Sequence, residues 1–127
     1  MNQRVLIVDD NEDVRRILGL RLQHAGFEVG DAADGAEGLD AVRHEKWDLV
    51  LLDLIMPRMD GFAFLQALRA TAGGPPVIVI TQYDDTENRQ RALALGATHY
   101  LPKGYAFERS FVGSVRKWLA APMASTA

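Results

Sequence analysis

The chain contains no cysteine, which excludes disulfide bonds and thiolate chemistry. No apolar run approaches the roughly 18 residues of a membrane span, and the N-terminus has no signal-peptide pattern. Positive charge is not in excess, because the formal net charge is −3, and this disfavours a nucleic-acid-binding surface. These absences predict a cytoplasmic protein whose chain binds neither nucleic acid nor a membrane.

The length of 127 residues suits one domain that buries roughly two thirds of its unfolded surface. Residues 120–127 are small and featureless. We therefore expect a domain over residues 1–120, followed over residues 121–127 by a disordered tail or the stub of a linker.

Five strand patterns alternate with five helix patterns along the chain. The strands are predicted from apolar runs at residues 4–9, 27–31, 49–52, 77–81 and 99–101. The helices are predicted from capping residues and helical spacing: after Asn11, at Asp34-Gly35, at Asp60-Gly61, after Asp84-Asp85, and a last one carrying Phe107, Phe111, Val115 and Leu119. Such alternation requires a parallel sheet with helices on both faces, so the predicted fold class is α/β.

Chemically capable side chains follow four of these strands. Asp9 and Asp10 follow the first, Asp53 the third, Thr81 ends the fourth, and Lys103 follows the fifth. Parallel connectivity brings the carboxyl ends of the strands to one edge of the sheet, where open α/β sheets build their sites. Each residue alone also has an ordinary structural explanation, such as a helix cap or an exposed lysine. Their conjunction favours a site centred on Asp53.

This set of side chains suits phosphoryl transfer. Three neighbouring carboxylates raise one another's pKa unless a cation joins them, and hard oxygen ligands without histidine or cysteine fit Mg²⁺. A carboxylate oxygen can attack phosphorus, as in aspartyl-phosphate chemistry. The Lys103 ammonium and the Thr81 hydroxyl can each hold an oxygen of the transferring group.

With these residues in place, the chain resembles the receiver domains of two-component response regulators. The segments that match in order and spacing are residues 5–11, 53–61, 79–81 and 96–103, and the match spans roughly residues 4–119. The resemblance implies a flavodoxin-like three-layer sandwich whose five-stranded parallel sheet has the order 2-1-3-4-5, with five helices. It also implies a switch rather than an enzyme, apart from assistance to its own phosphorylation and dephosphorylation.

The resemblance assigns roles to individual residues. Asp53 would accept a phosphoryl group from a phosphohistidine on a sensor histidine kinase or on a phosphotransfer protein of a phosphorelay. Asp10, Asp53 and the Ile55 carbonyl would ligate Mg²⁺, with Asp9 acting mainly through a water. Thr81 and Tyr100 would form the switch pair, whose hydroxyl moves toward the phosphate while the ring turns inward. The output surface would be the fourth helix, fifth strand and fifth helix, read by an unknown partner or effector domain.

Three departures from the family pattern carry expectations of their own. Gly104 follows Lys103 where the family usually has proline, and because a cis bond to a non-proline residue costs roughly 3 kcal/mol, a trans bond is favoured. Gln82 follows Thr81 where a small residue is usual, and bulky Ile55 and Tyr83 flank the path of hydrolytic water, which predicts a long-lived phosphoryl group. Thr98-His99 stands just before Tyr100, where many DNA-binding regulators carry an acidic residue that forms salt bridges in a symmetric dimer. Because that residue is absent here, we expect at most a weak homodimer.

Three other hypotheses remain open from the sequence. A Mg²⁺-dependent phosphohydrolase would need an acid two residues after its aspartyl nucleophile, but Asn11 and Ile55 stand at those positions. A flavin- or nucleotide-binding module would need a phosphate-binding first loop, which the acids of residues 9–13 would repel. An interaction-only receiver would have no use for the complete set of polar side chains at the strand ends.

Overall fold

The computed structural model describes residues 2–70, 74–82 and 85–120. Within them, a five-stranded parallel sheet has the order β2-β1-β3-β4-β5. Its strands are β1 (Arg4–Val8), β2 (Glu28–Ala32), β3 (Leu49–Leu52), β4 (Val77–Thr81) and β5 (His99–Pro102). The predicted α/β sandwich and its strand order are therefore confirmed, with the polar strand β2 at one edge.

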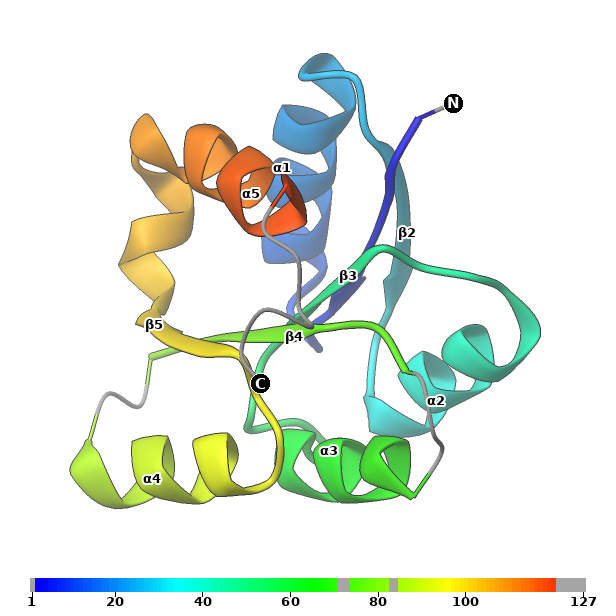
Figure 1. The fold of residues 1–127 in the computed structure, drawn as a ribbon, viewed down its shortest axis with the longest axis vertical. Helices are drawn as coiled ribbons and strands as arrows, with labels where there is room; N and C mark the ends of the chain where they lie inside the picture. The colour runs from blue at the N-terminus through cyan, green and yellow to red at the C-terminus, as the bar shows by residue number, and fades with distance from the viewer. Residues whose placement is uncertain (1, 71–73, 83–84, 121–127) are drawn as a thin grey trace.

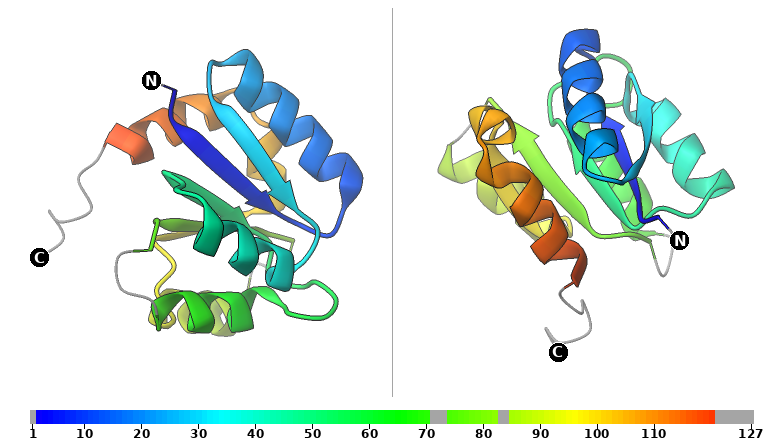
Figure 2. Two further views of the ribbon diagram at one scale, coloured as in Figure 1. Left: turned by 90° about the vertical axis from the view of Figure 1, so that its right-hand side faces the viewer. Right: turned by 90° about the horizontal axis from the view of Figure 1, so that it is seen from above.

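The helices form two layers around the sheet. They are α1 (Glu12–His24), α2 (Gly35–His44), α3 (Gly61–Arg69), α4 (Thr86–Ala94), α5 (Ser110–Ala120) and a 3-10 helix, η1 (Lys103–Phe107). Helices α1 and α5 cover one face of the sheet, while α2, α3 and α4 cover the other (Figures 1 and 2). Within the described ranges, no helix has both the length and the apolar character needed to cross a lipid bilayer.

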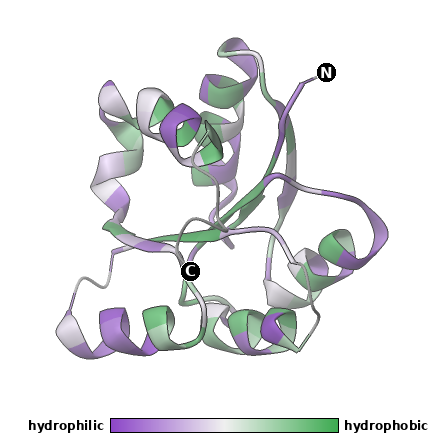
Figure 3. Ribbon diagram, viewed as in Figure 1, coloured by the Kyte–Doolittle hydropathy of each residue, from purple (hydrophilic) through white to green (hydrophobic). Residues whose placement is uncertain are grey.

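The sheet separates two apolar cores because neighbouring strand residues point to opposite faces. Val5 and Ile7 of β1 pack with α1 and α5, whereas Leu6 and Val8 pack on the side of α2 to α4. The hydropathy colouring shows green, apolar residues along the central strands β3 and β4, and a mixture of green and purple residues on the helices (Figure 3). Strand β3 is buried along its whole length, so Asp53, the residue that follows it, adjoins the apolar core.

The predicted capping residues begin the helices as expected. Asn11, Asp34 and Asp60 each accept a hydrogen bond from the backbone N–H three residues later, at 2.9–3.1 Å. In the predicted pair Asp84-Asp85, Asp85 caps α4, and Asp84 lies outside the described residues. Each side chain satisfies an N–H that the first helical turn leaves unpaired, which fixes where the chain leaves the carboxyl edge of the sheet.

The prediction that Phe107 lies on the last helix is wrong. Phe107 ends η1, and the extended backbone of Glu108 separates it from α5, which begins only at Ser110. The side chain of Phe107 is 46% exposed, whereas Phe111 and Val115 are buried as predicted. The i, i+4 spacing continued across a break that the helical pattern could not reveal. The predicted tail, residues 121–127, lies outside the described residues.

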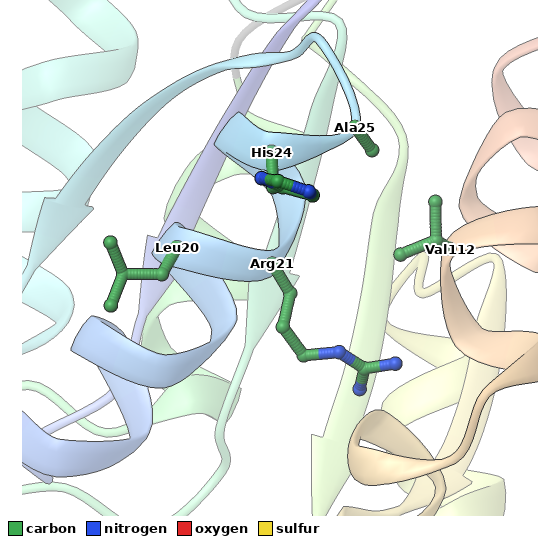
Figure 4. Close-up of a pocket in the computed structure, with 5 residues that line it drawn as sticks. All are labelled: Leu20, Arg21, His24, Ala25 and Val112. Atoms are coloured by element: carbon green, nitrogen blue, oxygen red, sulfur yellow. The ribbon is translucent and has the colours of Figure 1, made fainter.

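A groove between α1 and α5 lies on the side of the sheet that these two helices cover. It is lined by Leu20, Arg21, His24, Ala25 and Val112 (Figure 4). Arg21 extends from α1 toward the segment before α5, where it donates hydrogen bonds to the carbonyls of Ala106 and, at 2.7 Å, Glu108. Arg21 thereby ties the segment that follows Lys103 to α1.

Candidate functional site

The strand register brings the predicted site residues to the same edge of the sheet. Val8 pairs with Leu52, so Asp9 and Asp53 follow adjacent strands at the same level. The Asp53 N–H donates to the Val8 carbonyl at 2.9 Å, which continues the ladder one step past the strand ends. On the other side of β3, Leu52 pairs with Val79, and Thr81 pairs with Pro102, immediately before Lys103. The predicted convergence therefore follows from parallel pairing.

Three carboxylates form an acidic cluster at this edge. One carboxylate oxygen each from Asp9, Asp10 and Asp53 lies within 4.8 Å of the others. Asp9 and Asp53 are 4% and 5% exposed, whereas Asp10 faces solvent. Each buried acid also accepts a backbone N–H at 2.9 Å: Asp9 from Asn11, and Asp53 from Leu54. Hard, anionic oxygens in this arrangement fit a cation such as Mg²⁺, and one open side leaves room for its waters.

Lys103 reaches the acidic cluster from the end of β5. Its Nζ atom lies 3.1 Å from Asp9 Oδ2 and 3.4 Å from Asp53 Oδ2. The peptide bond between Lys103 and Gly104 is trans, as the glycine favoured. A trans bond is therefore compatible with a lysine in contact with both buried acids.

The cluster shifts the pKa values of its own members. Burial, followed by the charge of Asp9, raises the pKa of Asp53 above its ordinary 3.8, although Lys103 opposes the change. Burial alone would lower the pKa of Lys103, but the charges of Asp53 and Asp9 raise it above 10.5. The pocket therefore keeps the Lys103 ammonium protonated and disfavours negative charge on both Asp9 and Asp53 at once. A bound metal cation would relieve this repulsion between the two carboxylates.

Replacing Asp53 with asparagine is expected to raise the melting temperature by about 4 °C at neutral pH, with a chelator present to remove divalent cations. This corresponds to a gain of about 1 kcal/mol in the free energy of unfolding. Because folding raises the pKa of Asp53, the native state binds more protons than the unfolded chain from about pH 3.8 up to the folded value. Stability is therefore lost as pH rises through that window, and the variant lacks this loss.

Thermal unfolding followed by circular dichroism, at pH values below and above this window, measures the difference between wild type and variant. Added Mg²⁺ should stabilise the wild type more than the variant, because a ligand stabilises the state that binds it. A variant less stable than wild type at neutral pH in chelator would contradict this account of the pocket.

Thr81 and Tyr100 lie on the neighbouring strands β4 and β5. Thr81 is fully buried at the end of β4, and Tyr100 is 3% exposed, with its side chain in the core shared with α2 to α4. Arg89 of α4 covers the Tyr100 ring at 5.5 Å and donates to the Tyr100 carbonyl at 3.2 Å. His99 stacks on Trp118 of α5 with ring centroids 5.4 Å apart. Strand β5 is thus joined by side chains to both α4 and α5.

The loop between β3 and α3 carries Ile55, whose side chain is 47% exposed. The loop closes tightly, because the Gly61 N–H donates to the Leu54 carbonyl at 2.8 Å. A Cβ on Gly61 would lie only 2.5 Å from the Asp53 carbonyl oxygen, so this close approach requires glycine. Gln82 is exposed just beyond β4, and Tyr83 lies outside the described residues.

Two arginines that the sequence patterns did not indicate make contacts beside the site. Arg15 donates to the Asp9 carbonyl at 2.7 Å and pairs with Asp31 at 3.0 Å. Arg58 pairs with Asp34, a residue predicted only as a helix start. The cap after Asn11 places Arg15 at the first turn of α1 and could have suggested its contact. No local signal links Arg58 to a partner 24 residues earlier.

The fold and the edge residues define a class of protein. It is a doubly wound, flavodoxin-like α/β protein with an acidic pocket at the carboxyl edge of its sheet that could bind a metal ion. The family model described as "Response regulator receiver domain" matches residues 5–111. The chain therefore belongs to the receiver-domain family of response regulators, the signalling domains of two-component systems.

Curated relatives agree with this family. A response regulator named MprA from Mycobacterium sp. strain KMS is 41% identical over 108 residues, which cover 85% of this chain and 47% of that protein. MprA from Mycobacterium tuberculosis strain H37Ra is 40% identical over the same length, with the same coverage. The chain thus spans about half the length of the curated relatives it matches.

Solved structures show the same fold over nearly the whole chain. The chemotaxis response regulator CheY4 of Vibrio cholerae has a TM-score of 0.83 and 32% identity, covering 94% of this chain and 99% of its own. A CheY-like receiver domain protein from Methanospirillum hungatei has a TM-score of 0.86 and 30% identity, covering 94% of each chain.

Proposed function

We propose that this chain accepts a phosphoryl group on Asp53 in a Mg²⁺-dependent reaction. The donor is a phosphohistidine on a sensor histidine kinase or a phosphotransfer protein. The observation that carries the proposal is the acidic cluster with Lys103 Nζ in contact with both of its buried members, at 3.1 and 3.4 Å. Membership of the receiver-domain family supports the same conclusion.

The transfer needs little beyond positioning and charge. An Asp53 oxygen attacks phosphorus, so that the O–P bond forms as the N–P bond of the donor breaks and the imidazole nitrogen keeps the electron pair. Lys103 holds one oxygen of the transferring group by its ammonium, and the Thr81 hydroxyl donates to another. The hydrogen bond from the Leu54 N–H, at 2.9 Å, holds the Asp53 carboxylate in place during the attack.

The metal would be held by Asp10, Asp53 and the Ile55 carbonyl, with Asp9 acting mainly through a water. Mg²⁺ bound there would neutralise charge on the transferring group. Asp10 is the exposed member of the cluster and Asp9 a buried one, which suits Asp10 to direct ligation from the solvent side. Asp9 already accepts from the Asn11 N–H and contacts Lys103, so fewer of its lone pairs remain for a metal.

The output is a shift of two pre-existing conformations of α4, β5 and α5. Thr81 moves toward the phosphoryl group, and Tyr100 follows it inward. Arg89 responds because it contacts both the ring and the carbonyl of Tyr100. The stack of His99 on Trp118 extends the change to α5. An output partner or effector domain would read this surface.

Intact-mass spectrometry with a small acyl phosphate as donor tests the proposed function. With Mg²⁺ present, the wild-type chain is expected to gain the mass of one phosphoryl group. With chelator in place of Mg²⁺, the gain should disappear, because the carboxylate cluster then repels the anionic donor. No gain with Mg²⁺, or an equal gain in chelator, would refute the proposal.

The phosphoryl group is expected to be lost about ten times faster from an Ile55→Asn variant, a difference of about 1.4 kcal/mol in barrier. Ile55 is apolar and 47% exposed two residues after Asp53, where it hinders the hydrolytic water and cannot orient it. Asparagine can hydrogen-bond that water. The decay of label after removal of donor measures the rate.

Ile17→Asn is the matched control, because Ile17 is 41% exposed on α1 and belongs to no part of the site. Tyr83, the other bulky residue predicted to flank the path of the hydrolytic water, offers a parallel variant, Tyr83→Glu. Rapid loss of label from wild type, unchanged in Ile55→Asn and Tyr83→Glu, would show that these side chains do not set the lifetime.

A further inference from the structure

The loop from β3 to α3 contains a backbone conformation that its sequence does not favour. Arg58 has a φ of +64° and is the only described non-glycine residue with a positive φ. This left-handed region is unfavourable for a residue with a Cβ atom. Such a conformation persists only where surrounding contacts impose it. The contacts of Arg58 should therefore identify what holds the loop.

Arg58 is held by Asp34, the residue that caps α2. Arg58 Nε donates to Asp34 Oδ2 at 2.8 Å, and Arg58 Nη2 donates to the same oxygen. The other oxygen, Asp34 Oδ1, accepts the Glu37 N–H at 2.9 Å. Asp34 is only 1% exposed, while 71% of the Arg58 side chain is exposed. The exposed guanidinium thus lies over a buried carboxylate whose second oxygen is fixed by the helix.

The charge state of Asp34 agrees with this geometry. Its hydrogen bond from the Glu37 N–H, together with Arg58, lowers the pKa of Asp34 below 3.8 despite burial. Asp34 therefore remains ionised and available to Arg58 at neutral pH.

A second contact joins the same two segments. The Gly35 N–H donates to the Met59 carbonyl at 2.9 Å. A Cβ on Gly35 would lie 2.4 Å from that carbonyl oxygen, so the loop backbone lies directly against the first turn of α2. Residues 58 and 59 are thus fixed on one side by α2. On the other side, the bond from the Gly61 N–H to the Leu54 carbonyl closes the loop around Ile55.

We propose that Arg58, through its ion pair with Asp34, is a positioning residue that holds the β3–α3 loop in the conformation needed for Mg²⁺ binding. The loop supplies Ile55, whose carbonyl is a metal ligand in the proposed function, on which this inference rests. Arg58 itself touches neither the metal nor the phosphoryl group. It acts through the backbone between itself and Asp53.

The test is the Mg²⁺ dissociation constant, measured by titration calorimetry without any phosphodonor. Arg58→Gly removes the ion pair but permits the left-handed backbone, because glycine adopts it freely. We expect Mg²⁺ to bind about tenfold more weakly, the lower end of the range for residues that orient metal ligands. Loss of a positive charge can only strengthen the electrostatic attraction of the protein for Mg²⁺, so positioning and simple charge effects predict opposite signs.

Arg16→Ala is the matched control. Arg16 is also 71% exposed and pairs with an acid, Asp13, at 3.7 Å, but it lies on α1 outside this loop. The Arg16→Ala variant should bind Mg²⁺ with the same affinity as wild type. Amide hydrogen exchange over residues 54–60 should be faster in Arg58→Gly and unchanged in Arg16→Ala.

Asp34→Asn provides an independent variant, because asparagine caps a helix as well as aspartate does. It should also weaken Mg²⁺ binding, and the double variant with Arg58→Gly should bind no more weakly than the weaker single variant, since both break the same pair. Unchanged or tighter binding in Arg58→Gly, or additive losses in the double variant, would overturn the inference and leave the proposed function intact. A wild type that neither binds Mg²⁺ nor takes up phosphoryl would overturn both.

Discussion

An Asp53→Asn variant is expected to take up no phosphoryl group under conditions that label the wild type completely. The amide at residue 53 cannot act as the attacking carboxylate, and Asp9 does not replace it. Asp9 is buried, accepts from the Asn11 N–H at 2.9 Å and contacts Lys103 at 3.1 Å, so its oxygens are already committed. Asp10 is exposed but follows Asp9 outside the strand end. Intact mass after donor and Mg²⁺ measures the loss.

The control for this variant is Asp60→Asn. Asp60 belongs to the same loop and caps α3 by accepting the Ala63 N–H at 2.9 Å, a role that asparagine can retain. Its uptake should equal that of wild type. Full labelling of Asp53→Asn would place the acceptor elsewhere and remove the basis of the proposed chemistry.

Replacing Lys103 with alanine is expected to lower the maximal rate of phosphoryl uptake about a hundredfold, the size of losing one preorganised charge-stabilising donor. Its Nζ atom contacts both buried acids. In the proposed transfer, the ammonium would stabilise the charge that builds up on the transferring group. The same substitution removes a positive charge from the acidic cluster. The Mg²⁺ concentration for half-maximal rate should therefore fall while the maximal rate also falls.

Rapid-quench mass spectrometry at a series of Mg²⁺ concentrations separates these two effects. Lys117→Ala serves as control, because Lys117 is exposed on α5 and makes no contact with the acidic cluster. A weakened requirement for Mg²⁺ without any loss of maximal rate would mean that Lys103 only balances charge. A rate equal to that of wild type would exclude it from the transfer.

Much of the fold could be predicted because its determinants are local. The apolar runs of β3 and β4 and the caps Asn11, Asp34 and Asp60 each act within a few residues. Parallel pairing then brings the residues after those strands together, so the sequence alone predicts Asp9, Asp53 and Lys103 at one edge of the sheet. The wrong placement of Phe107 on the last helix has the same origin, because the break in the helix at Glu108 does not change the spacing of the apolar residues.

The parts of the site that could not be predicted depend on contacts between distant residues. Arg58 has a positive φ and a side chain paired with Asp34, 24 residues earlier, and nothing in its own segment indicates either feature. Which acids Lys103 contacts likewise depends on the path of the chain after β5, and Arg21 of α1 ties that path down through the carbonyls of Ala106 and Glu108. Sequence patterns indicate which elements form, and side-chain contacts then fix the loops between them.

The most direct test of the central claim is the location of the phosphoryl group. Borohydride reduces an acyl phosphate to the alcohol, so trapping the labelled wild-type chain and mapping its peptides by mass spectrometry identifies the acceptor. The account predicts homoserine in place of aspartate at Asp53 and at no other position. Reduction at Asp9 or Asp10, or a label that resists borohydride because it lies on another kind of side chain, would contradict it.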